Sequence, residues 1–208
     1  PSSGTAAAPD APAVPGGAAP TTAATDAASE RVLIDTPSVD GSIRLVGARL
    51  DDLKLKDYRV TVDPESPEVR LLSPTGTELP YFVESGWIAG AGIPKPDTNT
   101  LWTLESGEML APGSPITLAY DTGEGVVYRR TIEVDDHYLF TVKQTVENNT
   151  DAAITLYPYS RVQRRGTGDL AGFFILHEGY IGVFGDEGLV QTGYHKLEDD
   201  RVQEMPAA

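Results

Sequence analysis

The chain has 208 residues and an ordinary hydrophobic share of 40%, which is enough for one sizeable domain with a buried core. Acidic residues outnumber basic ones by 31 to 16, and the resulting formal charge of −15 at pH 7 argues against nucleic acid or an anionic membrane surface as a partner. There is no cysteine, which excludes disulfides, thiolate nucleophiles and Cys-ligated metals.

Residues 1–30 are predicted to form a disordered linker. They include eleven Ala and five Pro, and Val14 is their only larger aliphatic residue. Such a segment cannot bury enough apolar surface to offset the roughly 1–2 kcal/mol of backbone entropy lost per ordered residue. An Ala/Pro-rich tether typically holds a domain away from something else, such as a membrane anchor. No stretch of the chain is apolar for long enough to predict a transmembrane helix, and its first residues lack a signal-peptide pattern.

From Arg31 onward, short runs rich in Val, Ile, Leu, Thr and Tyr alternate with clusters of Gly, Pro, Asp and Asn, a pattern typical of strands and turns. Only residues 47–58, GARLDDLKLKDY, hint at a turn of helix, through Leu50, Leu53 and Tyr58. Strands are predicted at residues 32–36, 42–46, 69–72, 79–84, 116–120, 126–134, 138–147, 154–162, 173–176, 180–184 and 189–191.

An antiparallel hairpin is predicted from residues 126–134 and 138–147, because apolar side chains alternate with polar ones along both segments. Asp135 and Asp136 are expected to form its turn. On the first strand, one face carries four apolar residues: Val126, Tyr128, Ile132 and Val134. On the second, the corresponding residues are Tyr138, Phe140, Val142 and Val146.

Residues 154–162 are predicted as the third strand of the same meander, and Pro158 places this strand at an edge or a bulge. Many short strands with frequent turns and no alternating helices predict an all-β fold, a large antiparallel sandwich with little helix. We expect one domain over residues 31–197. Residues 198–208 form a tail of low apolar content that could also be the start of a truncated helix.

No arrangement in the sequence is typical of a catalytic or metal site. His137, His177 and His195 lack the short spacing of metal ligands. His177 and Glu178 could form an acid and base pair like those of sugar-processing enzymes, but neighbours on a strand point to opposite faces. We therefore expect no catalytic residue, no metal, no cofactor and no enzymatic activity.

Three other short patterns have simple interpretations. Residues 166–171, GTGDLA, match a loose dinucleotide fingerprint, but the sequence that follows is β-like and opens no helix to hold a pyrophosphate. Arg164 and Arg165 form the only local basic cluster, which fits a solvated strand end better than a contact for an acidic partner. Asn148 begins a glycosylation pattern, NNT, that its role in a turn explains fully.

Aromatic residues near flexible loops are the remaining candidates for a binding site. Trp87, Trp102, Tyr157 and Tyr159 could line a cleft of a β-sandwich and stack on a sugar. However, Trp87 continues an alternating strand and Trp102 opens another apolar run, LWTL. Tryptophans at such positions more often close a core than hold a ligand.

The order of several segments resembles the large periplasmic domain of the YidC family, the membrane protein insertases of Gram-negative bacteria. The resemblance covers about residues 32–191. The segments that carry it are VLIDTPSVDGSIRLVGARLDDLKLKDY, FVESGWIAG, PDTNTLWTL, YRRTIEVDDHYLFTVKQTVENNTDAAITLYPYSRVQR and LHEGYIGVFGDEGLVQ.

This resemblance implies a β-supersandwich similar in shape to galactose mutarotase, on the periplasmic face of the inner membrane. In the family, one transmembrane helix and a linker precede the domain, and five transmembrane helices that carry the insertase activity follow it. The family acts as an insertase and chaperone in protein transport, alone or with the Sec translocon. Nascent membrane proteins and Sec accessory subunits are the implied partners. The family's functional groove lies in membrane segments, so none of its residues can be placed on this sequence.

Two hypotheses follow. The first is a non-catalytic interaction or scaffold module of an insertase. The alternative is a carbohydrate-binding or mutarotase-like protein, in which Trp87, Trp102 and His177 would line a cleft. The absence of converging acid and base residues and the Pro-rich tether favour the first.

Overall fold

A computed structural model describes residues 30–166, 177–184 and 188–199 of the chain. The predicted linker up to residue 29, the predicted strand at 173–176, the Gly-rich pattern after Gly166 and the tail from residue 200 lie outside these ranges. The described residues form almost only antiparallel strands, which confirms the predicted all-β class. The chain divides into two compact units, residues 1–165 and 166–208.

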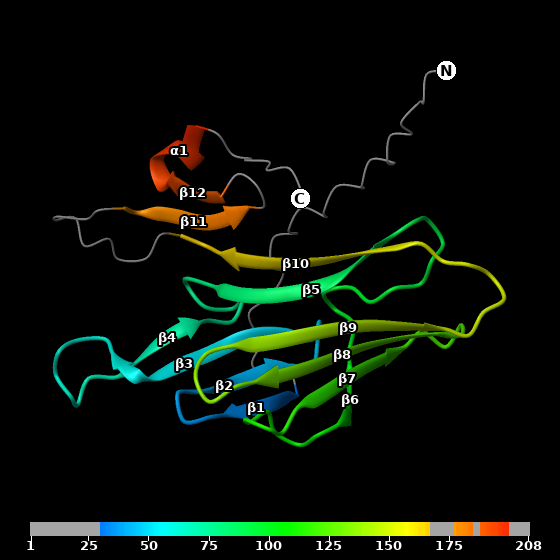
Figure 1. Cartoon of the computed structure of the whole chain (residues 1–208), viewed down its shortest axis with the longest axis horizontal. Coiled ribbons are helices and arrows are strands. Elements are labelled where there is room, and N and C mark those ends of the chain that lie inside the picture. Colours follow the sequence, from blue (N-terminus) through cyan, green and yellow to red (C-terminus); the bar gives the residue numbers. More distant parts are fainter. Residues whose placement is uncertain (1–29, 167–176, 185–187, 200–208) are drawn as a thin grey trace. The chain divides into compact units, whose positions relative to one another are not determined.

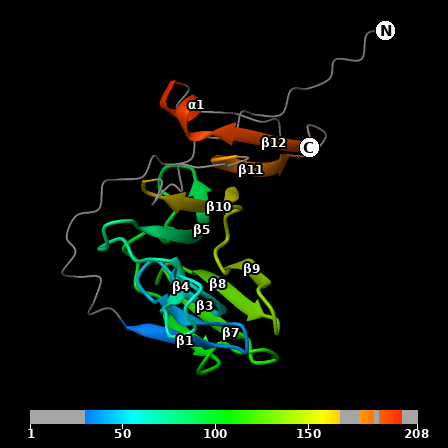
Figure 2. The ribbon, with the colours of Figure 1, turned by 90° about the vertical axis from the view of Figure 1, so that its left-hand side faces the viewer.

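Within the described part of the first unit, ten strands form two sheets (Figures 1 and 2). One sheet has the order β1-β2-β3-β5-β10, with β4 paired to β3, and the other has the order β6-β7-β8-β9. The strands of the larger sheet are β1 (Arg31–Asp35), β2 (Val39–Arg44), β3 (Arg49–Arg59), β4 (Glu68–Leu72), β5 (Tyr81–Ala89) and β10 (Leu156–Arg164). Those of the smaller sheet are β6 (Thr103–Ser106), β7 (Ile116–Asp121), β8 (Val126–Val134) and β9 (Phe140–Asn148).

The two sheets pack face to face as a sandwich. In both views β1 and β3 lie beside β7 and β8 (Figures 1 and 2). A backbone bridge joins Ile34 of β1 to Leu110, just after β6. The core between the sheets contains side chains from both, with Ile34, Ile43 and Trp87 from one and Leu118 and Tyr128 from the other. The predicted sandwich is therefore confirmed.

The hairpin of β8 and β9 forms as predicted, with Val126 opposite Asn148 and Val134 opposite Phe140. Its turn is longer than two residues, because the backbone N–H of Asp135 donates to the carbonyl of Leu139 at 3.1 Å. On β8 buried residues alternate with more exposed ones along the whole strand, so that every second residue from Val126 to Val134 is buried. On β9 the side predicted to be dry is only partly covered, because it lies at the edge of its sheet.

The prediction that residues 154–162 continue the meander is wrong. β10 pairs with β5 in the other sheet, with Leu156 opposite Ala89 and Arg164 opposite Tyr81. The segment after β9 therefore crosses from one layer of the sandwich to the other. The prediction that Pro158 marks an edge strand is confirmed, because within the described residues β5 is the only partner of β10. An edge strand tolerates the missing N–H donor of proline.

The hint of helix at residues 47–58 is also wrong, because β3 is an extended strand of eleven residues. Arg49, Asp51 and Leu53 are buried on the same face, and the residues between them are partly exposed. The period-2 pattern of this strand is hard to recognise in the sequence, because two residues of its buried face, Arg49 and Asp51, are charged. Charged residues are usually found at the surface. Leu50 and Leu53 therefore suggested a helical spacing that the fold does not use.

Unit two contains β11 (Gly179–Phe184), β12 (Gly188–Gly193) and α1 (Tyr194–Asp199). The two strands form an antiparallel pair, with Gly179 opposite Gly193, and confirm the strands predicted at 180–184 and 189–191. The rings of Tyr180 and Tyr194 meet edge to face with centroids 5.8 Å apart. In the ranges given above, the structure has no helix long and apolar enough to cross a membrane.

Candidate functional site

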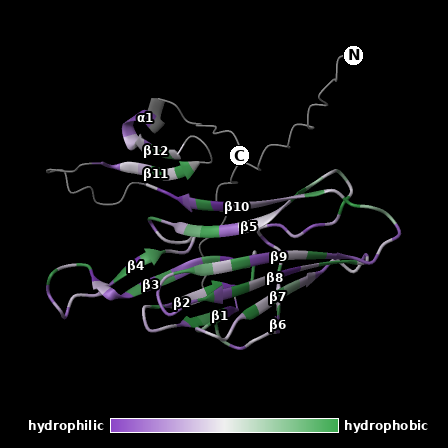
Figure 3. Cartoon of the chain, in the orientation of Figure 1, coloured by the Kyte–Doolittle hydropathy of each residue, from purple (hydrophilic) through white to green (hydrophobic). Residues whose placement is uncertain are grey.

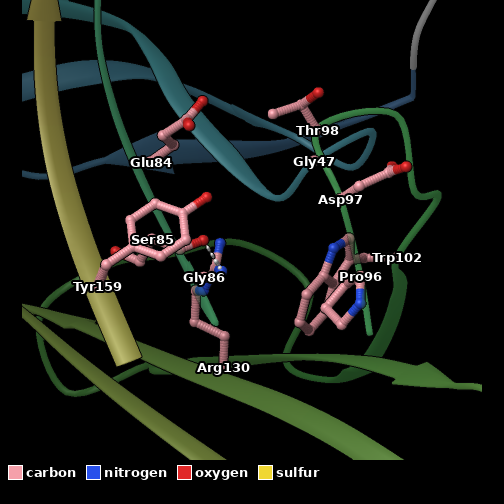
Figure 4. Close-up of a pocket in the computed structure, with 10 residues that line it drawn as sticks. All are labelled: Gly47, Glu84, Ser85, Gly86, Pro96, Asp97, Thr98, Trp102, Arg130 and Tyr159. Carbon is pink, nitrogen blue, oxygen red and sulfur yellow. Dashed lines mark hydrogen bonds between the residues drawn. The ribbon is translucent and has the colours of Figure 1, made fainter. Parts of the chain in front are cut away.

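The best candidate for a site is a small cavity in the first unit, lined by both sheets (Figure 4). Its volume is about 20 Å³, which is room for about one water molecule. The lining residues are Gly47, Glu84, Ser85, Gly86, Pro96, Asp97, Thr98, Trp102, Arg130 and Tyr159.

Arg130 is the central side chain of this cavity. It projects from β8 on the face whose other residues are apolar, and only 2% of it is exposed. Its Nη1 donates to the carbonyl of Ala48 at 2.6 Å, and its Nη2 donates to the carbonyl of Ser85 at 2.5 Å, as the dashed line in Figure 4 shows. One guanidinium of the smaller sheet thus bonds to the larger sheet at Ser85 of β5 and to the turn between β2 and β3 at Ala48.

The aromatic surroundings of Arg130 explain how a buried cation is tolerated. The guanidinium carbon lies 5.0 Å from the ring centroid of Trp102 and 6.0 Å from that of Trp87. These distances are in the range of cation–π attraction, which increases when water is removed. Burial lowers the pKa of Arg130 to about 10, with smaller opposing effects from Tyr159 and then Glu84, so the side chain is still protonated at pH 7.

The backbone that accepts from Arg130 has an unusual conformation. Ala48 has φ of 47°, and the preceding Gly47 has φ of 78°. Left-handed dihedrals cost a residue with a Cβ roughly 1 kcal/mol. Gly47 also donates its N–H to the carbonyl of Thr100 at 2.8 Å. Arg130 and Thr100 therefore bond to consecutive residues of this strained turn.

Glu84 on β5 is the only acidic residue of the cavity that is buried, with 4% exposed. Its two carboxylate oxygens contact Arg49 at 3.3 Å and Arg161 at 2.5 Å. Because both of its oxygens contact arginines, Glu84 is not placed to act as a base. Burial, followed by the charge of Glu84, raises the pKa of Tyr159 above its ordinary value.

The segment between β5 and β6 covers the cavity. Its backbone is attached on both sides, because Trp102 donates its N–H to the carbonyl of Leu45 at 3.0 Å and the Tyr128 hydroxyl donates to the carbonyl of Pro94 at 2.9 Å. Asp97 stabilises the turn by accepting from the N–H of Asn99 at 2.8 Å. Its carboxylate is therefore a turn acceptor, as expected for Asp in a loop.

The four aromatic residues proposed from the sequence separate into two groups. Trp102 and Tyr159 line the cavity, whereas Trp87 and Tyr157 do not. Trp87 and Trp102 are both buried, with ring centroids 6.3 Å apart and nearly parallel planes. Trp87 also lies 4.8 Å from the ring of Tyr128. The guanidinium of Arg130 lies near both tryptophan rings, which also contact each other.

The other residues singled out in the sequence do not join this cavity. His177 and Glu178 belong to unit two, just before β11. Asn148 acts in its turn, accepting from the N–H of Thr150 at 3.1 Å and donating to the carbonyl of Ala152 at 2.8 Å. The guanidinium of Arg164 lies over the ring of Tyr81 at 5.5 Å. Among the residues that the structure describes, no group of three His, Asp or Glu could hold a metal.

The chemistry of the cavity is that of a structural joint. Its cation is bonded to backbone carbonyls, its buried carboxylate is paired, and its volume admits about one water molecule. The carbohydrate alternative therefore has no support in this geometry. Sequence reasoning did not assign a role to Arg130, although a period-2 reading of VVYRRTIEV places it between Tyr128 and Ile132 on the apolar face.

Comparison with known proteins places this sandwich in a family. The profile of the YidC periplasmic domain matches residues 31–207 of the chain. A protein of Nitrobacter hamburgensis named membrane protein insertase YidC is 50% identical over 175 residues, which cover 83% of this chain. Proteins with the same name from Bradyrhizobium diazoefficiens and Rhizobium meliloti are 48% and 47% identical and cover 96% and 90% of it.

The chain spans 29%, 33% and 32% of the length of these three relatives. The match therefore concerns one part of a longer kind of protein. Within that part it includes every strand of both units, from β1 to β12. With the family profile matched over most of its length and relatives about half identical to it, the chain belongs to the YidC periplasmic domain family.

Proposed function

We propose that this chain works as a periplasmic, non-catalytic interaction module of a membrane protein insertase. The observation that supports this most directly is the family match over residues 31–207, together with relatives that are named insertases. Location in the periplasm follows from the name of the family. The module would act by contact with other proteins, as part of the insertion and folding of inner-membrane proteins.

Two structural observations support a role without turnover. The cavity between the sheets uses its charged groups to bond the fold together, and its volume of about 20 Å³ is too small for a metabolite. Edge strands, in contrast, are available for contacts in the first unit, where within the described residues β9 pairs only with β8. Exposed strand edges and apolar surface are features by which β proteins bind other chains.

The proposed partners are nascent membrane proteins and, more specifically, accessory subunits of the Sec translocon. An acidic domain favours partners whose contact surface is basic, because complementary charge steers association. The domain would hold such partners close to the insertase that the relatives' names describe.

A pull-down tests this proposal. The 208-residue chain is immobilised and exposed to detergent-solubilised inner membranes of Bradyrhizobium diazoefficiens, whose relative is 48% identical. We expect enrichment of Sec accessory subunits and of membrane proteins captured during synthesis, and this enrichment should decrease as salt screens the acidic surface.

An immobilised β-sandwich of unrelated sequence and similar negative charge serves as the control for nonspecific binding. Equal recovery of Sec subunits and membrane proteins on both surfaces, or recovery of neither at any salt concentration, would contradict the proposal.

A further inference from the structure

Exposed apolar residues lie on two segments of the first unit that contact each other, residues 58–62 and the turn between β8 and β9. We name this surface the tip patch, and it consists of Tyr58, Val60, Val62, Tyr138 and Leu139. Val60 is 63% exposed and Leu139 is 67% exposed, and Val62 is fully exposed. Figure 3 shows hydrophobic residues among hydrophilic ones in the loop between β3 and β4, which extends from the sheet. Several exposed apolar residues in one place mark an interaction site, whereas single ones are normal.

The tip patch is built from two loops that contact each other. The ring of Tyr58, at the end of β3, lies 6.2 Å from the ring of Tyr138, in the turn between β8 and β9. The Tyr138 hydroxyl donates to the carboxylate of Asp57 at 2.7 Å. The two sheets of the sandwich thus contribute one surface, although the residues are about 80 positions apart in the sequence.

Hydrogen bonds hold both loops in a defined shape. In the loop after β3, the N–H of Val60 donates to the carbonyl of Pro67 at 3.0 Å, and the N–H of Ser66 donates to the carbonyl of Asp63 at 2.9 Å. In the turn after β8, Asp135 accepts from the N–H of His137 at 2.9 Å and from that of Leu139 at 3.0 Å. A surface that is already ordered pays little entropy when it binds.

Acidic residues surround the tip patch without matching cations. Residues 57–68 and 135–139 contain a single Lys or Arg, which is Arg59, and it pairs with Glu68 at 3.4 Å. Backbone N–H groups of Leu139 and His137 keep the pKa of Asp135 below its ordinary value, so this carboxylate stays ionised at neutral pH. The carboxylates left without a Lys or Arg partner in these two segments are Asp57, Asp63, Glu65, Asp135 and Asp136.

We propose that the tip patch binds an apolar polypeptide segment flanked by Lys or Arg. Val60, Val62 and Leu139 would contact the apolar part, and the surrounding carboxylates would attract the basic flanks. The same carboxylates repel anionic lipid, which favours a polypeptide over a membrane surface as the occupant. This inference rests on the proposed function, because it names the surface and the partner chemistry of the interaction module.

Fluorescence anisotropy with synthetic peptides tests the inference on the 208-residue chain. The first peptide has a leucine-rich centre and lysines at both ends. The second has the same centre with glutamates at both ends, and the third keeps the lysines around a serine-rich centre. We expect the first peptide to bind at least about tenfold more tightly than the others, and its affinity to decrease with salt.

Variants then locate the binding surface. The double substitution Val60→Ser and Val62→Ser should weaken the first peptide by about tenfold, because two contacts with the apolar centre are lost. Both side chains are exposed, so the fold should be retained, which circular dichroism checks. Val162→Ser on β10 is the matched control, since Val162 is 64% exposed, and it should leave binding unchanged. Glu65→Gln with Asp136→Asn should reduce the salt dependence, whereas Glu124→Gln in the turn before β8 should not.

Each other outcome would overturn the inference. Unchanged binding by the valine double variant would show that the peptide binds elsewhere, which would leave the interaction module itself intact. Equal affinity for the glutamate peptide, or no binding of any peptide, would remove the proposed partner chemistry. Vesicles containing phosphatidylglycerol form a further arm, and binding to them that depends on Val60 and Val62 would show that the tip patch is a lipid site instead.

Discussion

Arg130 joins the two sheets by hydrogen bonds from a buried cation. Its Nη1 and Nη2 donate to the carbonyls of Ala48, in the turn before β3, and Ser85, on β5, and its guanidinium lies near the faces of two tryptophans. Removing the side chain would leave the carbonyls of Ala48 and Ser85 without this donor, beside a cavity that has room for only about one water molecule. An unsatisfied buried polar group costs about 1–3 kcal/mol.

We expect Arg130→Met to lower the free energy of unfolding by about 2–5 kcal/mol, since two carbonyls lose their donor and the cation–π contacts are lost. Urea unfolding followed by tryptophan fluorescence measures this change, because both tryptophans lie beside the substituted residue.

Arg70→Met is the matched control for this substitution. Arg70 pairs with Asp52 at 2.6 Å on an exposed part of the sheet, and such pairs contribute about 0–1 kcal/mol. Equal destabilisation by the two substitutions would show that the joint between the sheets does not depend on Arg130.

At the scale of the element, β2 shows how a close approach between strands determines a residue. The strand predicted here covers residues 42–46 and leaves out Asp40 and Gly41. β2 instead begins at Val39 and includes Gly41, which lies opposite Leu53 of β3. A Cβ added at Gly41 would lie 2.1 Å from the carbonyl oxygen of Asp52, so only glycine fits between the two strands.

Gly41→Ala is therefore expected to lower the free energy of unfolding by about 3 kcal/mol, because the atom in the way belongs to the backbone of β3 and cannot rotate aside. Thermal unfolding by circular dichroism measures the effect. As a control, Gly90→Ala introduces a Cβ at an ordinary 3.9 Å from Ile93 and should change stability by no more than about 1 kcal/mol. A harmless Gly41→Ala would mean that β2 and β3 separate more easily than their register indicates.

The elements also show what a sequence can predict. Local alternation is visible in the residues of β8, so the hairpin with β9 was predicted correctly. β3 was missed because Arg49 and Asp51 are buried charges that pair with Glu84 and Arg31 from other strands. The pairing of β10 with β5 was missed for a similar reason, since partners so distant in the chain leave no local signal. The residues that line the cavity are also far apart in the chain, from Gly47 to Tyr159. The sequence therefore indicates aromatic candidates but not which residues come together.

At the scale of the whole molecule, the first unit is a sandwich whose core includes three buried aromatic residues among aliphatic ones. Trp87 contacts both Trp102 and Tyr128 in the interior. Their burial assigns the tryptophans to the core of the fold, as their strand positions indicated. A sandwich of this architecture can carry very different functions, so the function is argued from its surfaces and its family.

We expect a panel of monosaccharides to leave the tryptophan fluorescence of the 208-residue chain unchanged, because both rings are buried against protein and the cavity beside Trp102 admits about one water molecule. Fluorescence titration at millimolar sugar measures this. Unfolding in urea is the control that the signal responds to the surroundings of the rings, and saturable quenching by any sugar would contradict the expectation.

The place of β10 in the larger sheet also determines the order in which that sheet can form during synthesis. β5 is synthesised early, but β10, its partner on one side, comes after all four strands of the smaller sheet in the chain. Pairings between such distant segments form slowly, since a long loop must close first. A ribosome-bound chain that ends before Leu156 therefore exposes the edge of β5 that β10 would cover. This incomplete sheet is the intermediate that would be most open to proteolysis and aggregation.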